Sequence, residues 1–321
     1  YIMAGFIRFE EAPVKIGFGG LACNLLATTV TAGENLPLQA VRALGYNGAV
    51  AVTANGPIDG TWSATYHLVK NAGVGSCTDT TSYSAAGCDN FFQPGEAGST
   101  DFVLQRGSSE ADFIHLSVGG GDAIFKKGMA TTFTLSAEPN AIVTATLAGN
   151  FYDCGMAVAG GGITAGASKD GGGDLAVAHG SKVTATKGQV GFNCDPFTAT
   201  YEASRGLTPI YTLGKLDAIF VMVTDPQQSL SMQGENIANP VLKGGGAGTC
   251  PDDALCLDTA DIEFAVKDVC NQPLATFEVC GFINSRDIEV AENDVLRGNV
   301  SVTDYTFKQK MTAVECSETG E

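Results

Sequence analysis

Apolar and polar residues alternate along several short stretches of the chain, which is the pattern of a strand with one buried face. In the clearest stretch, residues 61–69, the apolar positions fall on one face: Trp62, Ala64, Tyr66 and Leu68. The polar positions fall on the other face: Thr61, Ser63, Thr65 and His67. Residues 142–152 alternate in the same way, with their polar positions at Thr144, Thr146 and Asn150. Both stretches predict strands that cover a core on one side only.

Other elements are predicted from glycine, proline and local composition. Residues 14–30 alternate around glycines and predict a pair of strands. Residues 110–116 predict the start of a short helix. Residues 34–45 carry proline near their start and glycine at their end, as short helices do. The later segment 207–214, which matches them, favours an extended chain, so we expect extended structure in both.

One stretch of the sequence occurs twice. Residues 44–66 and the stretch that begins at Leu213 share one order of features: a glycine turn, an apolar strand, a turn with proline, and an alternating strand. At one constant offset in the numbering (213 − 44 = 169), the matched pairs are Leu44 with Leu213, Gly45 with Gly214, Ala49 with Ala218 and Pro57 with Pro226. A repeat of this size that is found twice predicts a duplicated domain rather than a solenoid.

Weaker matches extend the repeat in both directions. Upstream, at an offset of 171, the matched pairs are Gly17 with Gly188, Gly20 with Gly191, Cys23 with Cys194 and Thr29 with Thr200. Downstream, residues 137–140 match residues 291–294 at an offset of 154. The decrease in offset predicts that the first copy contains the longer insertion.

These matches divide the chain, which is long enough for two domains that each bury a core. The expected parts are a first domain at 1–154 with an N-terminal arm and a long insertion at 70–101, a Gly-rich linker at 155–182, a second domain at 183–307, and a polar C-terminal tail at 308–321. Thr, Val, Ala and Gly dominate the periodic stretches, which favours short strands and turns. We therefore expect a mainly β fold of two tandem copies with little helix.

The formal net charge of −17 disfavours binding to a nucleic-acid backbone or to an anionic membrane. No apolar run is as long as a membrane span, and the first residues contain no basic segment followed by an apolar one, as a secretion signal has. An acidic surface is most often simply a soluble one. The same charge also fits a surface that must not adhere to a polyanion.

The sequence indicates no catalytic, cofactor or metal site, so we do not expect an enzyme. With only three histidines, His67, His115 and His179, a histidine base beside a nucleophile is hard to assemble. No cysteine pair has C-x-x-C spacing or a nearby histidine, which argues against zinc. The ten cysteines are expected to be mostly reduced if the protein stays in a cytosol, although close pairs such as Cys270 and Cys280 are able to staple loops.

Two short stretches resemble the tube proteins of tailed-phage tails. They are Gly56-Pro57-Ile58-Asp59-Gly60-Thr61-Trp62-Ser63-Ala64-Thr65-Tyr66 and Thr132-Phe133-Thr134-Leu135-Ser136-Ala137-Glu138-Pro139-Asn140, with the Thr-rich strand that follows the second. In that family each domain is a β-sandwich flanked by a helix, and six domains close their inner half-barrel sheets into a ring around a lumen. In some long tails the domain is duplicated, so that three chains form a pseudo-sixfold ring. The resemblance carries no catalytic residues, and this chain lacks a convincing flanking helix.

A tube that conducts DNA needs an inner surface without phosphate anchors, because hydroxyls, amides and carboxylates do not hold a polyanion. We therefore expect the polar strand faces to line the lumen: Thr61, Ser63, Thr65, Thr144, Thr146, Ser229, Ser231 and Gln233. The apolar faces, led by Trp62, Tyr66 and Met232, are expected to pack inside the sandwich. The insertion at 70–101 is expected to contact the next ring.

On this interpretation the protein is a structural virion component that assembles in the host cytoplasm. Its expected partners are copies of itself in stacked rings, together with tape-measure and tail-end proteins, and DNA passes through it without binding. A rival interpretation from another class is a secreted β-rich subunit of a surface filament, a surface layer or an adhesin. The acidic, Gly- and Thr-rich composition fits both. Disulfides such as Cys77–Cys88 and Cys250–Cys256 would favour the rival.

Overall fold

The computed structural model describes the parts of the chain that form strands and their tight connections. These residues are 14–18, 21–25, 27–67, 69–71, 113–118, 121–126, 128–152, 157–159, 175–177, 179–180, 183–187, 192–194, 198–216, 218–235, 259–267, 273–289 and 297–304. No α-helix occurs among them, and nearly all belong to antiparallel strands. The expectation of a mainly β fold with little helix is confirmed.

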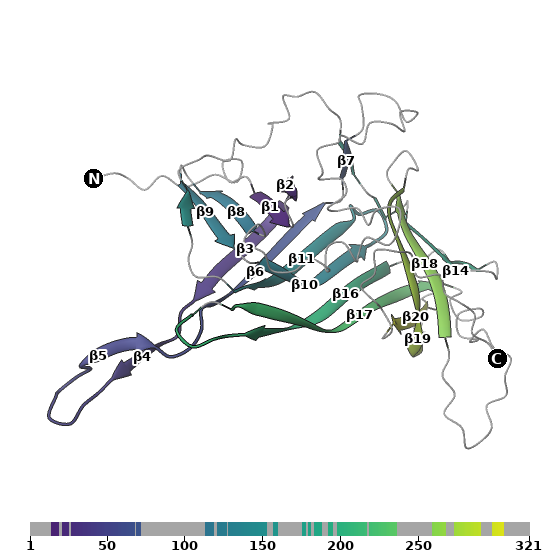
Figure 1. The fold of residues 1–321 in the computed structure, drawn as a ribbon. Helices are drawn as coiled ribbons and strands as arrows, with labels where there is room; N and C mark the ends of the chain where they lie inside the picture. Colours follow the sequence, from purple (N-terminus) through teal and green to yellow (C-terminus); the bar gives the residue numbers. More distant parts are fainter. Residues whose placement is uncertain are drawn as a thin grey trace, which may run out of the picture.

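The largest unit is an antiparallel sheet of eleven strands (Figure 1). In hydrogen-bonded order its strands are β15 (Phe192–Cys194), β14 (Val183–Lys187), β18 (Thr259–Lys267), β19 (Pro273–Glu289), β20 (Arg297–Asp304), β17 (Phe220–Glu235), β16 (Thr198–Ile210), β10 (Gly128–Ala137), β11 (Thr144–Phe151), β6 (Asp59–His67) and β3 (Ala27–Asn35). Strands from the N-terminal half of the chain therefore lie at one end of this sheet and strands from the C-terminal half at the other.

Three smaller sheets accompany it. The five-stranded one has the order β12 (Ala157–Ala159), β9 (Gly121–Lys126), β8 (Phe113–Val118), β1 (Val14–Phe18) and β2 (Leu21–Leu25). The two-stranded ones pair β13 (Leu175–Val177) with β7 (Val69–Asn71), and β4 (Leu38–Val41) with β5 (Ala51–Ala54). The β4–β5 hairpin projects beyond the body of the large sheet (Figure 1).

The two halves of the chain have the same order of paired strands. In the second half the order is β15-β14-β18-β19-β20-β17-β16. In the first half it is β2-β1-β8-β9, followed by β10-β11-β6-β3, and β9 leads into β10 across a single residue. The long strand β19 thus takes the place of β9 and β10 together, and β16 and β17 take the places of β3–β4 and β5–β6.

The agreement extends to single hydrogen bonds in the two hairpins. Leu38 pairs with Ala54 in the first hairpin, and Leu207 pairs with Val223 in the second, at the same offset of 169 for both partners. The Tyr46 amide donates to the Ala43 carbonyl, as the Lys215 amide does to Thr212. Gly45 and Gly214 close these turns with φ of 87° and 86°, a conformation that glycine adopts without the strain that a Cβ imposes. The matched glycines are therefore explained by turn geometry.

Beyond the hairpins the strand registers define the offset more closely than the sequence matches do. Trp62 lies opposite Ala32, and the equivalent pair is Leu230 and Tyr201, so the offset is 169 on β3 and 168 on β6. The sequence-based offset of 171, which matched Thr29 with Thr200, is wrong at β3. On β10 and β11 the offset is 153 rather than 154, and the bulge at 130–132 recurs at 283–285.

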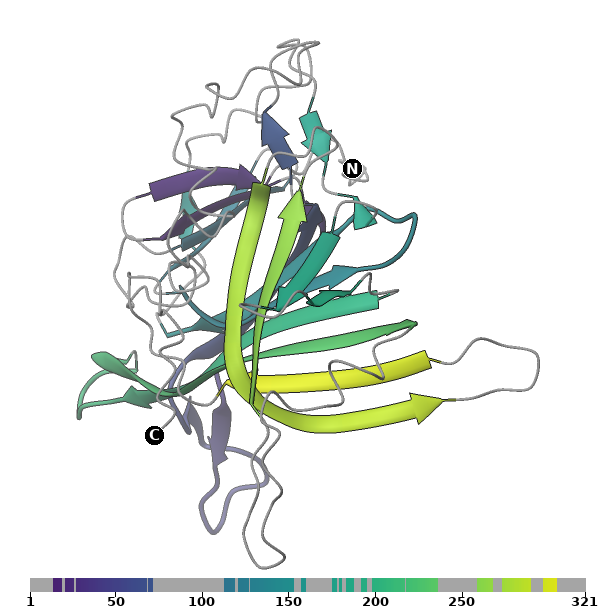
Figure 2. The ribbon, with the colours of Figure 1, turned by 90° about the vertical axis from the view of Figure 1, so that its right-hand side faces the viewer.

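The main core lies between two layers of the large sheet. Figure 2 shows β19 curving, so that its first part stands with β18 across the face formed by β10, β16 and β17. Phe277 of β19 stacks on Tyr201 of β16 at 4.1 Å between ring centroids, and Phe133 and Phe264 are each centred 6.2 Å from Phe277. These aromatic contacts fasten the curved part of the sheet onto its flat part.

Several local predictions from the sequence can be compared with the structure. The expected helix at 110–116 is wrong where it is described, because residues 113–116 belong to β8 and its pairing with β1 and β9 overrides local propensity. Extended structure at 38–41 is confirmed by β4. The insertion from residue 72 to 101, most of the linker and the tail from 308 lie outside the described residues. Cys280 is disulfide-bonded, a state that the sequence left open.

Candidate functional site

The eight residues expected to line a lumen lie on one face of the large sheet. Thr61, Ser63 and Thr65 alternate on β6 with buried Trp62 and Ala64. The remaining five occupy the same face of β11 and β17: Thr144, Thr146, Ser229, Ser231 and Gln233. The opposite face of these strands forms the core, including Leu147, Leu230 and Met232 at 1% exposure or less. We call the surface that carries the eight residues the polar face.

Strand pairing aligns the polar face into rows that run across both halves. One row continues from β19 to β6 through Ser285, Ser301, Ser231, Thr200, Ser136, Thr144 and His67. A second row continues from β20 to β3 through Thr303, Ser229, Glu202, Thr134, Thr146, Thr65 and Thr29. The hydroxyls of Thr65 and Thr146 are hydrogen-bonded across the strands at 3.1 Å.

Sequence reasoning missed the part of these rows that lies between the halves. Ser136 on β10 and Thr200 on β16 belong to the polar face, as do Thr134 and Glu202. The alternation of Ala199, Tyr201 and Ala203, all buried, with polar residues at 198–204 is the signal that could have identified them.

The charges on the polar face are acidic. Glu202, Asp287 and Asp59 are exposed on it, at the middle, at one end and at the edge of the described rows. Among the side chains that the structure describes on this face, no lysine or arginine occurs. The nearby Arg205 points to the other side, is 5% exposed and donates from Nε to the Ala130 carbonyl at 2.7 Å. The face therefore combines hydroxyls with negative charge.

Two hairpins extend the sheet beyond this face, and we call them arm 1 (residues 38–54) and arm 2 (residues 207–223). Most of the exposed large apolar side chains in the described part of the chain lie on them or at their bases. On arm 1 they are Leu38, Val41, Leu44, Tyr46, Val50 and Val52, and on arm 2 they are Ile210, Leu213, Leu216, Ile219, Phe220 and Met222. Leu44 and Leu213, at equivalent positions of the two tips, are fully exposed. Exposed apolar groups in such numbers mark an interaction surface.

The base of arm 2 rests on the first half of the chain. The Ala218 amide donates to the Tyr152 carbonyl at 3.1 Å, and the Ile58 amide donates to the Leu216 carbonyl at 3.1 Å. Ala218 and Val221 are buried together with the Tyr152 side chain. Burial also raises the pKa of the Tyr152 hydroxyl above its ordinary value, with a smaller opposing effect from Asn150.

The two halves also join through strand pairing. Residues 132–137 of β10 pair with residues 199–204 of β16, and Arg205 follows directly at the end of this pairing. Burial lowers the pKa of the Arg205 guanidinium to about 10, which still leaves it charged at neutral pH. This junction, which we call the internal seam, is therefore a continuous sheet with a buried, charged anchor at its end.

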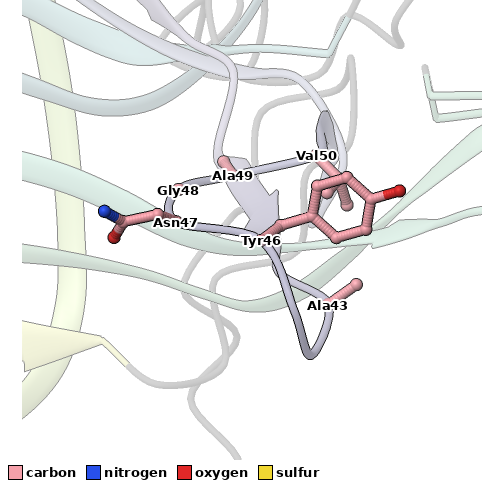
Figure 3. A pocket seen from close by; sticks show the side chains of 6 residues that line it. All are labelled: Ala43, Tyr46, Asn47, Gly48, Ala49 and Val50. Atoms are coloured by element: carbon pink, nitrogen blue, oxygen red, sulfur yellow. The ribbon is translucent and has the colours of Figure 1, made fainter.

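One open concavity among the described residues lies at the tip of arm 1. Figure 3 shows it at the tip of arm 1, where it is open and lined by Ala43, Tyr46, Asn47, Gly48, Ala49 and Val50. It contains no cluster of acid and base side chains. Among the described side chains, no group of three or more His, Cys, Asp or Glu residues is close enough to hold a metal ion.

A scan against protein-family models gives no match, and a comparison with curated proteins finds no relative. In the part of the chain that the structure describes, no helix is long and apolar enough to cross a membrane.

Proposed function

We propose that the protein is the structural subunit of a hollow tube built from stacked rings, as in the tail of a tailed phage, through which DNA passes. One observation carries this proposal: two sets of strands have the same pairing order, and β10 of the first set pairs with β16 of the second, so that one large sheet crosses both halves and its polar face carries hydroxyls and carboxylates. A head-to-tail contact is heterologous, and repetition of such contacts generates rings or helical assemblies.

The two strand sets fit a duplicated domain, with the first copy at 1–154 and the second at 183–307. Three chains would then supply six domains to one ring, which has the pseudo-sixfold symmetry of the duplicated tube proteins. The equal registers of the two hairpins and the recurring bulge on β10 and β19 support this division. No catalytic or cofactor role is included in the proposal.

The polar face is the proposed lumen surface. Rows of serine and threonine cross both halves, and Glu202 and Asp287 add negative charge. When lysine or arginine binds a DNA phosphate, counterions are released from the DNA, and this release favours binding. Hydroxyls and carboxylates do not neutralise phosphates and therefore give no such gain in affinity. DNA therefore slides past this surface instead of adhering to it.

Ring stacking is assigned to the apolar arm tips. Leu44 and Leu213 project fully into solvent at equivalent positions, so each ring would offer six similar apolar contacts to the next ring. The insertion at 70–101 is proposed as a second contact between rings. Tape-measure and tail-end proteins are proposed partners at the ends of the tube.

The proposal is tested by electron microscopy of the purified protein, viewed down any long axis of the particles. The expected result is hollow rings or tubes with six similar lobes built from three chains. Solid filaments without a lumen would overturn the tube and favour an appendage on a cell surface.

The second candidate function is a secreted subunit of a surface filament, a surface layer or an adhesin. The disulfide at Cys280 favours it, because disulfides persist mainly outside the reducing cytosol. Peptide mapping of non-reduced protein from the native host is the discriminating measurement. Quantitative disulfides in protein taken from the cell surface would favour this candidate, and free thiols in protein taken from particles would favour the tube.

A further inference from the structure

Two strand edges of the molecule have no partner among the described residues. β3 ends the order of the large sheet and pairs only with β6, and residues 285–289 of β19 pair only with β20. Their equivalents in the other half are β16 and β10, which pair with each other at the internal seam. We propose that β3 of one chain pairs with residues 285–289 of a second copy, in the register of the internal seam. This inference rests on the proposed ring.

The offsets between the halves fix that register. Phe133 lies opposite Ala203 in the internal seam. The equivalent of Phe133 is Arg286 (133 + 153 = 286), and the equivalent of Ala203 is Glu34 (203 − 169 = 34). The full set of opposed positions between chains is Ser285 with Asn35, Arg286 with Glu34, Asp287 with Gly33, Ile288 with Ala32, and Glu289 with Thr31. No pair in this register opposes two like charges.

The register places a basic residue opposite an acidic one at the centre of the contact. Glu34 is exposed, and Arg286 is the only basic residue among positions 285–289. At the equivalent place in the internal seam stands the pair Phe133 and Ala203, both buried. Opposite charges directly across two strands stabilise their pairing, and a shift of register would separate them. The Glu34–Arg286 pair therefore selects the correct edge and register between chains.

A second contact follows from the arms. Leu207, Ala218 and Val221 pack beside Tyr152 at the base of arm 2, whereas their equivalents on arm 1 are exposed: Leu38, Ala49 and Val52. Val221 is 6% exposed, and Val52 is 63% exposed. In the sequence, Tyr305 is the equivalent of Tyr152 at the offset of the β10 and β11 strands, and it lies outside the described residues. The base of arm 1 thus exposes the same residue types that arm 2 buries, and this apolar surface fits the second half of another chain.

Charge reversal in the full-length chain tests the pair. Glu34→Arg and Arg286→Glu are each expected to raise the concentration needed for half-assembly by roughly tenfold or more, because each places like charges face to face. The double variant restores opposite charges and is expected to return close to the wild-type value. Glu263→Arg, the same change of charge at an exposed residue of β18, is the control and is expected to assemble normally. Circular dichroism verifies that each variant remains folded.

Sedimentation and electron microscopy measure the assembly of these variants. Wild-type assembly by both single variants, or a double variant as weak as the singles, would overturn the charge pair. If the wild-type protein forms tubes and one of these two outcomes is observed, the proposed function stands and only the proposed pairing register is contradicted.

A disulfide trap provides an independent test. Gly33→Cys introduces a side chain where nothing lies within 4 Å of the added Cβ, and Asp287→Cys lies opposite it in the proposed register. After mild oxidation, the double-cysteine chain is expected to form linked multimers on a non-reducing denaturing gel, and a ladder that ends at three chains indicates a closed ring. A ladder beyond three chains would support the seam and contradict the three-chain ring. Absence of linking beyond the Gly33→Cys, Glu263→Cys control would overturn the seam.

Discussion

The side chains of Tyr201 and Phe277 stack 4.1 Å apart at the centre of the main core, and both are at most 1% exposed. The Tyr201 hydroxyl donates to Gln228 Oε1 at 2.9 Å, and Gln228 Nε2 donates to Asp304 Oδ2 at 3.1 Å. Tyr201 thus contacts the curved strand β19 through its ring and begins a buried chain of hydrogen bonds through its hydroxyl. At the scale of residues, the fold depends on such contacts between its layers.

Phe277→Ala is expected to lower the free energy of unfolding by about 3–5 kcal/mol, because it removes a buried aromatic ring and leaves a cavity. Phe220→Ala is the matched control, since Phe220 is 57% exposed, and is expected to change stability by about 0.5 kcal/mol or less. Denaturant unfolding of the dispersed chain measures both. Similar losses for the two variants would contradict the assignment of the core.

Tyr66 predicts an alkaline limit to stability. Burial raises the pKa of its hydroxyl well above the ordinary value of 10, so the folded chain keeps the proton where the unfolded chain loses it. The contribution of the buried Tyr66 hydroxyl to the free energy of unfolding is complete below pH 10. Above that pH it declines by about 1.4 kcal/mol per pH unit for this one group. Tyr66→Phe is expected to reduce this slope, and Tyr46→Phe, at an exposed side chain, to leave it unchanged. Unfolding curves between pH 9 and 11 measure the slopes. Equal slopes in the Tyr66→Phe variant and the wild type would contradict the prediction.

At the scale of elements, the hairpins show how the same local structure meets two environments. Arm 1 and arm 2 share their register and their glycine turn, yet only arm 2 has its base covered. The difference arises because arm 2 follows the internal seam and therefore lies against Tyr152. The tips remain exposed in both. In the proposed assembly, the bases of the arms would therefore serve contacts within a ring, and the tips would serve contacts between rings.

Leu44→Asp combined with Leu213→Asp is expected to shorten tubes or leave single rings, because charged tips lose apolar burial between rings. Folding is expected to be unchanged, since both side chains are fully exposed. Tube length in electron micrographs is the measurement, with Leu44→Met and Leu213→Met as a control that keeps the apolar surface. Deletion of residues 72–101 tests the alternative contact, and unchanged tube length after that deletion would contradict its stacking role.

The polar face predicts a separate phenotype. Ser63→Arg combined with Ser231→Arg adds two phosphate anchors per chain to the proposed lumen and is expected to slow DNA passage while tubes still assemble. Ser63→Asn with Ser231→Asn controls for size without charge. DNA ejection from assembled particles is the readout, and normal ejection by the arginine variant would contradict the lumen assignment.

At the scale of the whole molecule, much of the fold was predictable where one strand face is buried. The alternation at 61–67 identified both faces of β6, since Trp62, Ala64 and Tyr66 share one side. The rows through Ser136 and Thr200 were missed, although the alternation at 198–204 indicates them, because the sequence match placed Thr200 two positions out of register. Exposed Leu44 and Leu213 were also not identified, since an apolar residue in a sequence indicates burial and only the folded pairing places these two at a tip. Curvature of β19 depends on packing far away in sequence.

The internal seam has a consequence for how assembly depends on concentration. Pairing of β10 with β16 joins two sets of strands that one polypeptide already tethers, so it forms at an effective concentration set by the chain and not by the solution. The proposed ring of three such chains needs two associations between chains where six separate domains would need five, so its formation would fall off less steeply on dilution. Disassembly of the proposed ring would follow the same division: only the seams between chains would open, and the unit that leaves would be a whole chain.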